Sequence, residues 1–342
     1  MYPTLFTFFD YPVPAYFTLL IIGFSAATFL GARVAKRGGH DPDTIIDLGL
    51  FSLIMGVLGA RVLHVFADGF FMQYVYQCVD PTQVAWPMPE AECLAIEGWR
   101  WNAELNGCAP LERDCFAWAK FWQGGLAYYG GLIAASVFGI WFLKHDKYPV
   151  LKGVDIAGMG IPLGLFFGRM GCFLGGCCFG VVSDSPWALV FPPGSSASRE
   201  QHEHGLLASV NMESLPVVPA QLFEAIGCLA IAAFTMLWLR PRKRFDGQLM
   251  LVFLVLYAFL RFGLEYVRAD DRGDFGWFTT SQWISLVIVA FCAVAWPRLR
   301  AHAVSLMAAP AAAGPEAAPE APTTDGHAPD TSEPSKPPAA DA

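Results

Sequence analysis

Seven long apolar stretches constrain what this chain can fold into. A helix that crosses the hydrocarbon core of a bilayer needs about 20 mostly apolar residues. The stretches that approach or meet this length lie at residues 15–33, 46–66, 123–143, 154–174, 219–239, 247–265 and 281–297. The sequence therefore predicts an all-α integral membrane protein with seven transmembrane helices.

Composition supports a membrane protein and argues against other classes. Charged residues make up 15% of the 342 residues and apolar residues 55%, whereas soluble domains carry about 25% charged residues. A chain this apolar does not have the composition of a disordered protein. Its net charge of −8, with no basic stripe, excludes nucleic acid as a partner. The membrane bilayer is therefore the first partner that we expect.

Lysine and arginine in the short connections give the expected orientation of the spans. Basic residues follow the first, third, fifth and seventh stretches, whereas residues 1–14 contain none and the loop at 175–218 contains only Arg199. Because cytoplasmic loops carry the excess of Lys and Arg, the N-terminus is expected outside and the C-terminus in the cytoplasm. The first stretch lacks a basic region before it and a small-residue cleavage site, so we expect a retained helix and not a signal peptide.

The chain is expected to divide into four segments. These are the first two spans at 1–67, an extracytoplasmic insertion at 68–122, the other five spans at 123–300 and a cytoplasmic tail at 301–342. Residues 308–342 are rich in Ala and Pro and contain no larger aliphatic or aromatic side chain, so the tail is predicted to be disordered.

Nine cysteines fall into two groups and two isolated residues. Cys78, Cys93, Cys108 and Cys115 lie in the insertion, where an oxidising compartment predicts two disulfides in one of three pairings. The second group, Cys172, Cys177 and Cys178, follows the fourth span without a fourth ligand or a Cys-x-x-Cys pair nearby, so no metal site is predicted. Close packing of small thiols at a helix end is the favoured interpretation. Cys228 and Cys292 have the pattern of buried apolar residues.

Polar residues inside the spans indicate where a functional site should lie, because ionisable groups in a bilayer are costly. The candidates are Tyr16, Arg61, Arg169, Glu224, Tyr257, Arg261, Glu265 and Arg268. With the expected orientation, all of them lie in the outer leaflet. Taken singly, each charged residue could be a structural or snorkelling group, but their common depth favours a shared site.

Arginine at this depth indicates phosphate binding. A guanidinium group stays charged and matches phosphate oxygens with a planar fork of N–H donors, and the phosphates at this depth belong to lipid head groups. We expect a cleft lined by Arg169 and Arg261, with Arg61 as a further candidate, to bind an anionic phospholipid. Glu224 and Glu265 are expected to hold the guanidinium groups in place.

Four motifs carry a resemblance to a known family. They are Gly-Gly-x4-Gly-Gly at 124–131, Gly-Arg-x-Gly-x-Phe-x6-Gly at 168–180, Pro-x-Gln-Leu-Phe-Glu at 219–224, and Tyr-x3-Arg-x3-Glu-x2-Arg at 257–268. With these motifs the chain resembles the prolipoprotein diacylglyceryl transferase family over most of residues 1–300, apart from the insertion at 68–122. The resemblance implies an enzyme of the bacterial cytoplasmic (inner) membrane that uses no cofactor and no metal.

The resemblance also implies a reaction. The diacylglyceryl group of phosphatidylglycerol would move to the lipobox cysteine thiol of a prolipoprotein, whose signal peptide the enzyme binds, giving a thioether and glycerol phosphate. A phosphate leaving group suits a site with positive charge. The attacking thiol belongs to the substrate and must lose its proton.

Matching positions assign roles to individual residues by resemblance. The candidate catalytic residues are Arg169, Arg261, Tyr129 and Glu265. The candidate substrate-binding residues are Tyr16, Arg61, Cys172, Cys177, Gly180, Glu224, Tyr257 and Arg268. Three positions depart from the family, because Tyr129 replaces a common His, Cys172 an Asn and Cys177 a Glu. Which group takes the thiol proton stays open between Tyr129, through hydrogen bonding, and the lipid phosphate itself.

Two alternatives to this function remain open from the sequence. The first is a non-catalytic membrane homologue that binds lipid or a partner, which the three departures would suit. The second is a related transferase that uses another lipid donor or thiol acceptor.

Overall fold

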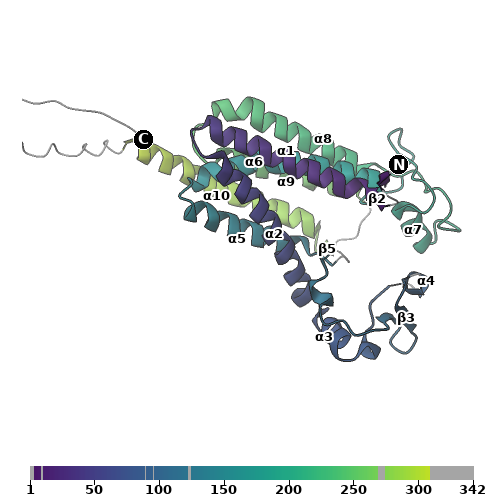
Figure 1. The fold of residues 1–342 in the computed structure, drawn as a ribbon. Helices are drawn as coiled ribbons and strands as arrows, with labels where there is room; N and C mark the ends of the chain where they lie inside the picture. The colour runs from purple at the N-terminus through teal and green to yellow at the C-terminus, as the bar shows by residue number, and fades with distance from the viewer. Residues whose placement is uncertain are drawn as a thin grey trace, which may run out of the picture. The chain divides into compact units, whose positions relative to one another are not determined.

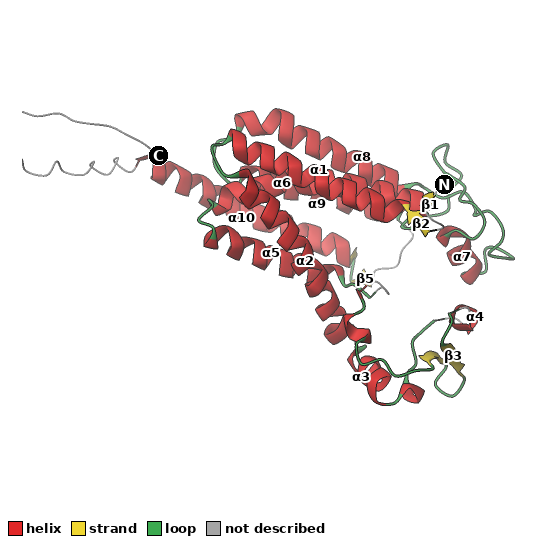
Figure 2. Ribbon diagram, viewed as in Figure 1, coloured by secondary structure: helices red, strands yellow, loops and turns green. Residues whose placement is uncertain are grey.

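Long helices dominate the computed structural model, which describes residues 4–8, 11–88, 90–94, 96–121, 125–268 and 274–308 (Figures 1 and 2). Among these residues, six helices are long and apolar enough to cross a membrane. They are α1 (Ala15–Arg37), α2 (Pro42–Ala67), α6 (Val150–Gly175), the segment Ala220–Arg242 that starts with α8 (Ala220–Ala233), the segment Gln248–Val267 that starts with α9 (Gln248–Leu264), and α10 (Thr280–Ala308). These helices confirm an all-α, multi-pass membrane protein.

The expected third span differs from the other six. Helix α5 runs from Tyr128 to His145, which is 18 residues, and residues 125–127 before it are not helical. Two tyrosines and two glycines fill its first turn, so its apolar part is shorter than the expected 123–143. Residues 122–124 lie outside the described part of the chain.

The last helix also differs from expectation. Helix α10 continues to Ala308, so the expected start of a disordered tail at residue 301 is wrong for residues 301–308. Ala, Leu and Met in this stretch are good helix formers and extend the preceding helix without a break. Residues 309–342, where the rest of the expected tail falls, lie outside the described residues.

The helices pack through small residues on their inner faces. Helix α6 contacts α1, α8 and α9, while α2 contacts α1 and α5. Helices α2 and α5 approach so closely that a Cβ atom on Gly59 would lie 2.6 Å from the carbonyl oxygen of Gly130. Outward side chains such as Ile21 and Leu237 are 67% and 77% exposed, as expected for helices that face lipid.

A polar contact joins the start of α6 to the start of α9. Asp155 near the start of α6 pairs with Lys243 at 3.0 Å and accepts hydrogen bonds from the backbone N–H groups of Gly247 and Leu249. Those residues lie just before and within the first turn of α9. The contact therefore fixes where α9 begins against α6.

Short elements fill the connections between the long helices. They are β1 (Thr4–Phe8) paired with β2 (Tyr11–Pro14), α3 (Phe71–Val79), α4 (Glu90–Leu94), β3 (Trp99–Asn102) paired with β4 (Gly107–Pro110), α7 (Ser196–Glu203), and β5 (Asp274–Phe275) paired with β6 (Phe278–Thr279). All three strand pairs are antiparallel.

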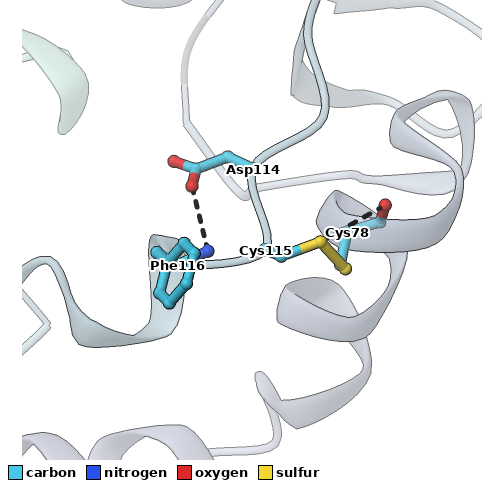
Figure 3. Close-up of a disulfide and its surroundings, with 4 residues drawn as sticks. All are labelled: Cys78, Asp114, Cys115 and Phe116. Atoms are coloured by element: carbon cyan, nitrogen blue, oxygen red, sulfur yellow. Dashed lines mark hydrogen bonds between the residues drawn. A yellow bond between two sulfur atoms is a disulfide. The ribbon is translucent and has the colours of Figure 1, made fainter.

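Two disulfides hold the insertion together, as the four cysteines predict. They join Cys78 to Cys115 and Cys93 to Cys108, which selects one of the three pairings. Figure 3 shows the first, where Cys115 is flanked by a turn in which the Asp114 carboxylate accepts a hydrogen bond from the N–H of Phe116 at 3.0 Å. The second crosslinks α4 to β4. The sequence could not select this pairing, because it depends on how the segment folds back on itself.

Candidate functional site

Glu224, in the first turns of α8, is the centre of a buried polar network. Its side chain is fully buried, and its Oε2 lies 2.9 Å from Nε of Arg169 and 3.5 Å from Nη1 of Arg268. The hydroxyl of Tyr257 donates to its Oε1 at 3.0 Å. Four segments thus contribute to one network, namely the end of α6, the start of α8, the helix α9 and the chain just after α9. One carboxylate faces two guanidinium groups, so the three charges sum to +1.

A second buried ion pair lies one turn further along α9. Nη1 of Arg261 contacts Oε2 of Glu265, and Nη2 donates to the hydroxyl of Ser281 at 3.0 Å. The i, i+4 spacing places Arg261 and Glu265 on one face, as the sequence predicts. Arg261 follows Tyr257 by four residues, a rise of about 6 Å along the helix axis. The two networks therefore lie at the same end of α9.

The backbone at Gly180 ties the ends of three helices together. Gly180 donates to the carbonyl of Val218 at 2.8 Å, and Val181 donates to the carbonyl of Val267 at 3.0 Å. A bridge also pairs Gly180 with Arg268. The chain after α6 thus runs between the residues that precede α8 and those that follow α9, which holds Arg169, Glu224 and Arg268 in register.

Gly180→Ala should separate these segments. A Cβ atom there would clash with the carbonyl oxygen of Val267 and lie 2.8 Å from that of Val218. We expect a loss of about 1–3 kcal/mol in stability, measured as a lower unfolding midpoint in detergent. The control is Gly164→Ala in α6, where a Cβ would meet no atom within 4 Å. This variant should gain about 0.5–1 kcal/mol in stability, because Ala is a better helix former than Gly. An unchanged midpoint for Gly180→Ala would contradict the close approach.

Three cysteines and Tyr16 adjoin this network. The sulfur atoms of Cys172, Cys177 and Cys178 all lie within 4.8 Å of one another. Tyr16 packs on Gly171, with ring and backbone atoms 3.1–3.3 Å from where a Cβ would stand, and its hydroxyl interacts electrostatically with Arg169 and the three thiols. The cysteines thus cluster at the helix end, as the sequence interpretation expects.

Charge and hydrogen bonding favour the thiolate of one of these cysteines. Cys178 lies in the loop beyond α6. Hydrogen bonds with Cys172 and Cys177, and the positive charges of Arg169 and Arg268, hold the pKa of its thiol below the ordinary value, against the opposing effect of burial.

Two adjacent tyrosines begin α5, and they differ in their surroundings. Tyr128 interacts electrostatically with both Arg169 and Glu224. Tyr129, the candidate by resemblance, makes an edge contact with the ring of Tyr128 at 5.5 Å and is 51% exposed. Consecutive helical residues point about 100° apart, so the two phenols do not face the same side. Tyr128 is 70% exposed, and the role of Tyr129 as a catalytic residue stays a prediction.

Arg61 lies in different surroundings. Its guanidinium group is 5.1 Å from the ring of Tyr74 and donates to the carbonyl oxygens of Trp118, Ala117 and Gly125 at 2.6, 2.8 and 3.1 Å. These contacts attach the end of the insertion to α2. The role of Arg61 as a phospholipid ligand stays a prediction.

Three further residues of this region were not sequence candidates. Gln221, fully buried in the first turn of α8, donates to the carbonyl of Cys177 at 2.7 Å. Ser281 and Cys178 are the others. The Pro-x-Gln-Leu-Phe-Glu motif includes Gln221 and was the available signal for it. Ser281 carried no signal, because its role depends on the packing of α10 against α9.

The fold and the polar networks define a multi-pass membrane protein with buried arginine–carboxylate pairs at one end of its helices. The family model of prolipoprotein diacylglyceryl transferase matches residues 3–90 and 110–297. The chain therefore belongs to the prolipoprotein diacylglyceryl transferase family, and it is a membrane transferase of lipoprotein biosynthesis. The unmatched residues between 90 and 110 hold β3 and most of β4, so the segment outside the family model is shorter than the expected insertion at 68–122.

Curated relatives support this membership over most of their length. The chain is similar to the phosphatidylglycerol–prolipoprotein diacylglyceryl transferase of Clostridium tetani, with 25% identity over 84% of this chain and 94% of the relative. It is 29% identical to the proteins of that name from Stenotrophomonas maltophilia, over 81% of this chain and 84% of the relative, and Chromohalobacter salexigens, over 83% and 87%.

Proposed function

We propose that this protein transfers the diacylglyceryl group of phosphatidylglycerol to the lipobox cysteine thiol of prolipoproteins, giving a thioether and glycerol phosphate. The observation that carries the proposal is the ion pair of Arg169 with Glu224, in a chain of this family. The Glu224 side chain is fully buried, whereas that of Arg169 is 19% exposed. The carboxylate thus holds the guanidinium group on its buried side, and the exposed part stays accessible to a ligand.

Arg169 has donors to spare for a phosphate. Its Nε takes part in the pair with Glu224, and the proposal assigns its two Nη groups to the phosphate. As the glyceryl C–O bond breaks, negative charge grows on the phosphate oxygen that leaves. Fixed N–H donors that face this oxygen lower the barrier, because they need no reorganisation during the reaction. Arg261, held by Glu265 and Ser281, would supply a second positive charge.

The proposed topology keeps seven spans, with α5 as the third. It places the N-terminus, the insertion at 68–122 and both arginine networks on the outer side, with residues after 300 in the cytoplasm. Disulfides in the insertion support this side, since they persist in oxidising compartments. The basic loops support it too. A bacterial inner membrane then presents phosphatidylglycerol and the signal peptides of prolipoproteins to the same site.

A transfer assay tests the proposal. Purified protein in nanodiscs with phosphatidylglycerol should add one diacylglyceryl group to a synthetic lipobox peptide, seen as a mass increase of the peptide. A peptide with Ser in place of the lipobox Cys should stay unmodified. Nanodiscs that contain phosphatidylethanolamine as the only lipid should give no product. Equal yield from both lipids would show a different donor specificity, and no product from either would contradict the proposal.

A non-catalytic homologue is the second candidate, favoured by the departures at Tyr129, Cys172 and Cys177. Expression in a host depleted of its own diacylglyceryl transferase separates the two functions. Restored growth supports transfer, whereas well-inserted protein without growth supports binding alone.

A further inference from the structure

The cluster of Cys172, Cys177 and Cys178 has a geometry that the proposed transfer does not use. Cys172 lies in the last turn of α6, and Gly176 ends the helix in the left-handed conformation at φ 73°. The turn brings the next two cysteines back toward Cys172, so that all three sulfur atoms lie within 4.8 Å of one another. In the part of the chain that the structure describes, these three form a group close enough to share one metal ion.

The spacing suits thiolate ligands of one ion. Zinc–sulfur bonds of about 2.3 Å separate two thiolates on the same ion by about 3.8–4.0 Å. Sulfur atoms already within 4.8 Å need only small side-chain rotations to reach that spacing. All three are free thiols, whereas the four cysteines of the insertion are paired in disulfides.

Backbone conformation and side-chain burial at the cluster also point to a ligand. Cys178 has φ 61°, in the left-handed region that side chains other than glycine rarely adopt. Such strain persists where surrounding contacts impose it, commonly at functional sites. Fully buried Gln221 donates to the carbonyl of Cys177, and its Oε1 has no hydrogen-bond partner within the described part of the chain.

The surrounding charge balances a metal–thiolate group. Three thiolates around a divalent cation carry a net charge of −1. In the adjoining network, Arg169 and Arg268 pair with Glu224, and these three charges sum to +1. The charges of the two groups therefore cancel.

We propose that Cys172, Cys177 and Cys178 bind a thiophilic divalent cation of the zinc class, and that its open fourth position receives the acceptor thiol of the prolipoprotein. Structural zinc sites commonly have four protein ligands, whereas sites that bind a substrate have three and an open position. No fourth His, Cys, Asp or Glu ligand joins the cluster among the described residues. The second half of the proposal depends on the transfer function proposed above.

The chemistry balances without another reactant. The acceptor thiol loses its proton to solvent as its sulfur binds the cation. The sulfur electron pair then forms the C–S bond to the glyceryl carbon. The C–O bond breaks, and its electron pair leaves on the phosphate oxygen of glycerol phosphate. The cation thus activates the acceptor thiol, because a thiol that coordinates such an ion is deprotonated.

Metal titration of the full-length protein tests the site. Protein in detergent, reduced and stripped with a chelator, should bind about one equivalent of Co²⁺ with a sulfur-to-cobalt absorption band that Zn²⁺ abolishes. Cys177→Ser and Cys178→Ser should each weaken binding by more than about tenfold. Cys292→Ala, which removes a buried free thiol in α10, should bind like the unmodified chain. Absence of the band, or equal binding by the Cys177→Ser/Cys178→Ser variant, overturns the site.

Two further measurements separate the metal site from the transfer function. A lipobox peptide should shift the cobalt band, and its Cys→Ser form should not. An unchanged band overturns the assignment of the fourth position. Full transfer by metal-free protein also overturns it and leaves the transfer function intact. Bound metal with a shifted band but no lipidated product contradicts the transfer function and leaves the metal site standing. A disulfide within the cluster in membrane-extracted protein, found by thiol alkylation and mass analysis, overturns the site.

Discussion

Arg169→Ala should reduce the rate of diacylglyceryl transfer by about 10²–10³-fold, the usual cost of losing one donor to a developing negative charge. The chain should still fold, because Glu224 keeps its contacts with Arg268 and Tyr257. The measurement is the initial rate of peptide lipidation in phosphatidylglycerol nanodiscs, normalised to correctly folded protein.

Two control variants sharpen this measurement. Arg169→Lys keeps the positive charge but not the planar fork of donors, so it should recover only part of the rate. Arg242→Ala removes an exposed arginine at the end of the segment Ala220–Arg242, where its guanidinium lies 5.1 Å from the ring of Trp238. It should transfer at the unmodified rate. Full activity of Arg169→Ala would contradict the role of this guanidinium group in stabilising the leaving phosphate.

Glu224→Gln should lower both stability and transfer. The change removes the carboxylate that pairs with the guanidinium groups of Arg169 and Arg268. The Glu224 side chain is fully buried, so water cannot replace it. Breaking one buried ion pair costs about 3–5 kcal/mol. We expect a clearly lower thermal midpoint in detergent and little transfer, because Arg169 would lose the partner that orients it.

One control keeps the carboxylate at position 224, and the other makes the same Glu-to-Gln change at an exposed position. Glu224→Asp retains the carboxylate on a shorter side chain and should recover part of the stability. Glu213→Gln changes an exposed carboxylate in the loop before α8 and should leave the midpoint unchanged. A Glu224→Gln variant as stable as the Glu213→Gln control would show that the buried carboxylate does not hold the network together.

The helices were predictable to different degrees. The stretches that became α1, α2, α6 and α9 were found within a few residues, because a long apolar run in a bilayer has no better way to satisfy its backbone than a helix. Helix α5 begins later than expected, at Tyr128, because residues 125–127 before it are not helical. Helix α10 runs on to Ala308, beyond its expected end. That end was misplaced because composition was the only signal for it. Boundaries depend on local capping and packing, which apolar content does not report.

The polar networks were predictable only in part. The i, i+4 spacing of Arg261 and Glu265 indicated their ion pair, which forms between α9 and the residue that directly follows it. The partners of Glu224 come from segments 33 to 55 positions away in the chain, and no periodicity selects them. Motifs indicated that Arg169 and Glu224 matter, but not that they touch.

The amino-acid pattern alone was enough for the membrane class, the positions of most helices and the end at which charged residues gather. These features follow from the free energy of transferring each segment from water into lipid, which is a sum over the residues of that segment. Contacts required the folded molecule. The pairing of the four insertion cysteines and the convergence of Arg169, Tyr257 and Arg268 on Glu224 depend on how segments fold back and how closely their backbones approach. Those quantities arise from packing between distant segments, so they become defined when the helices meet.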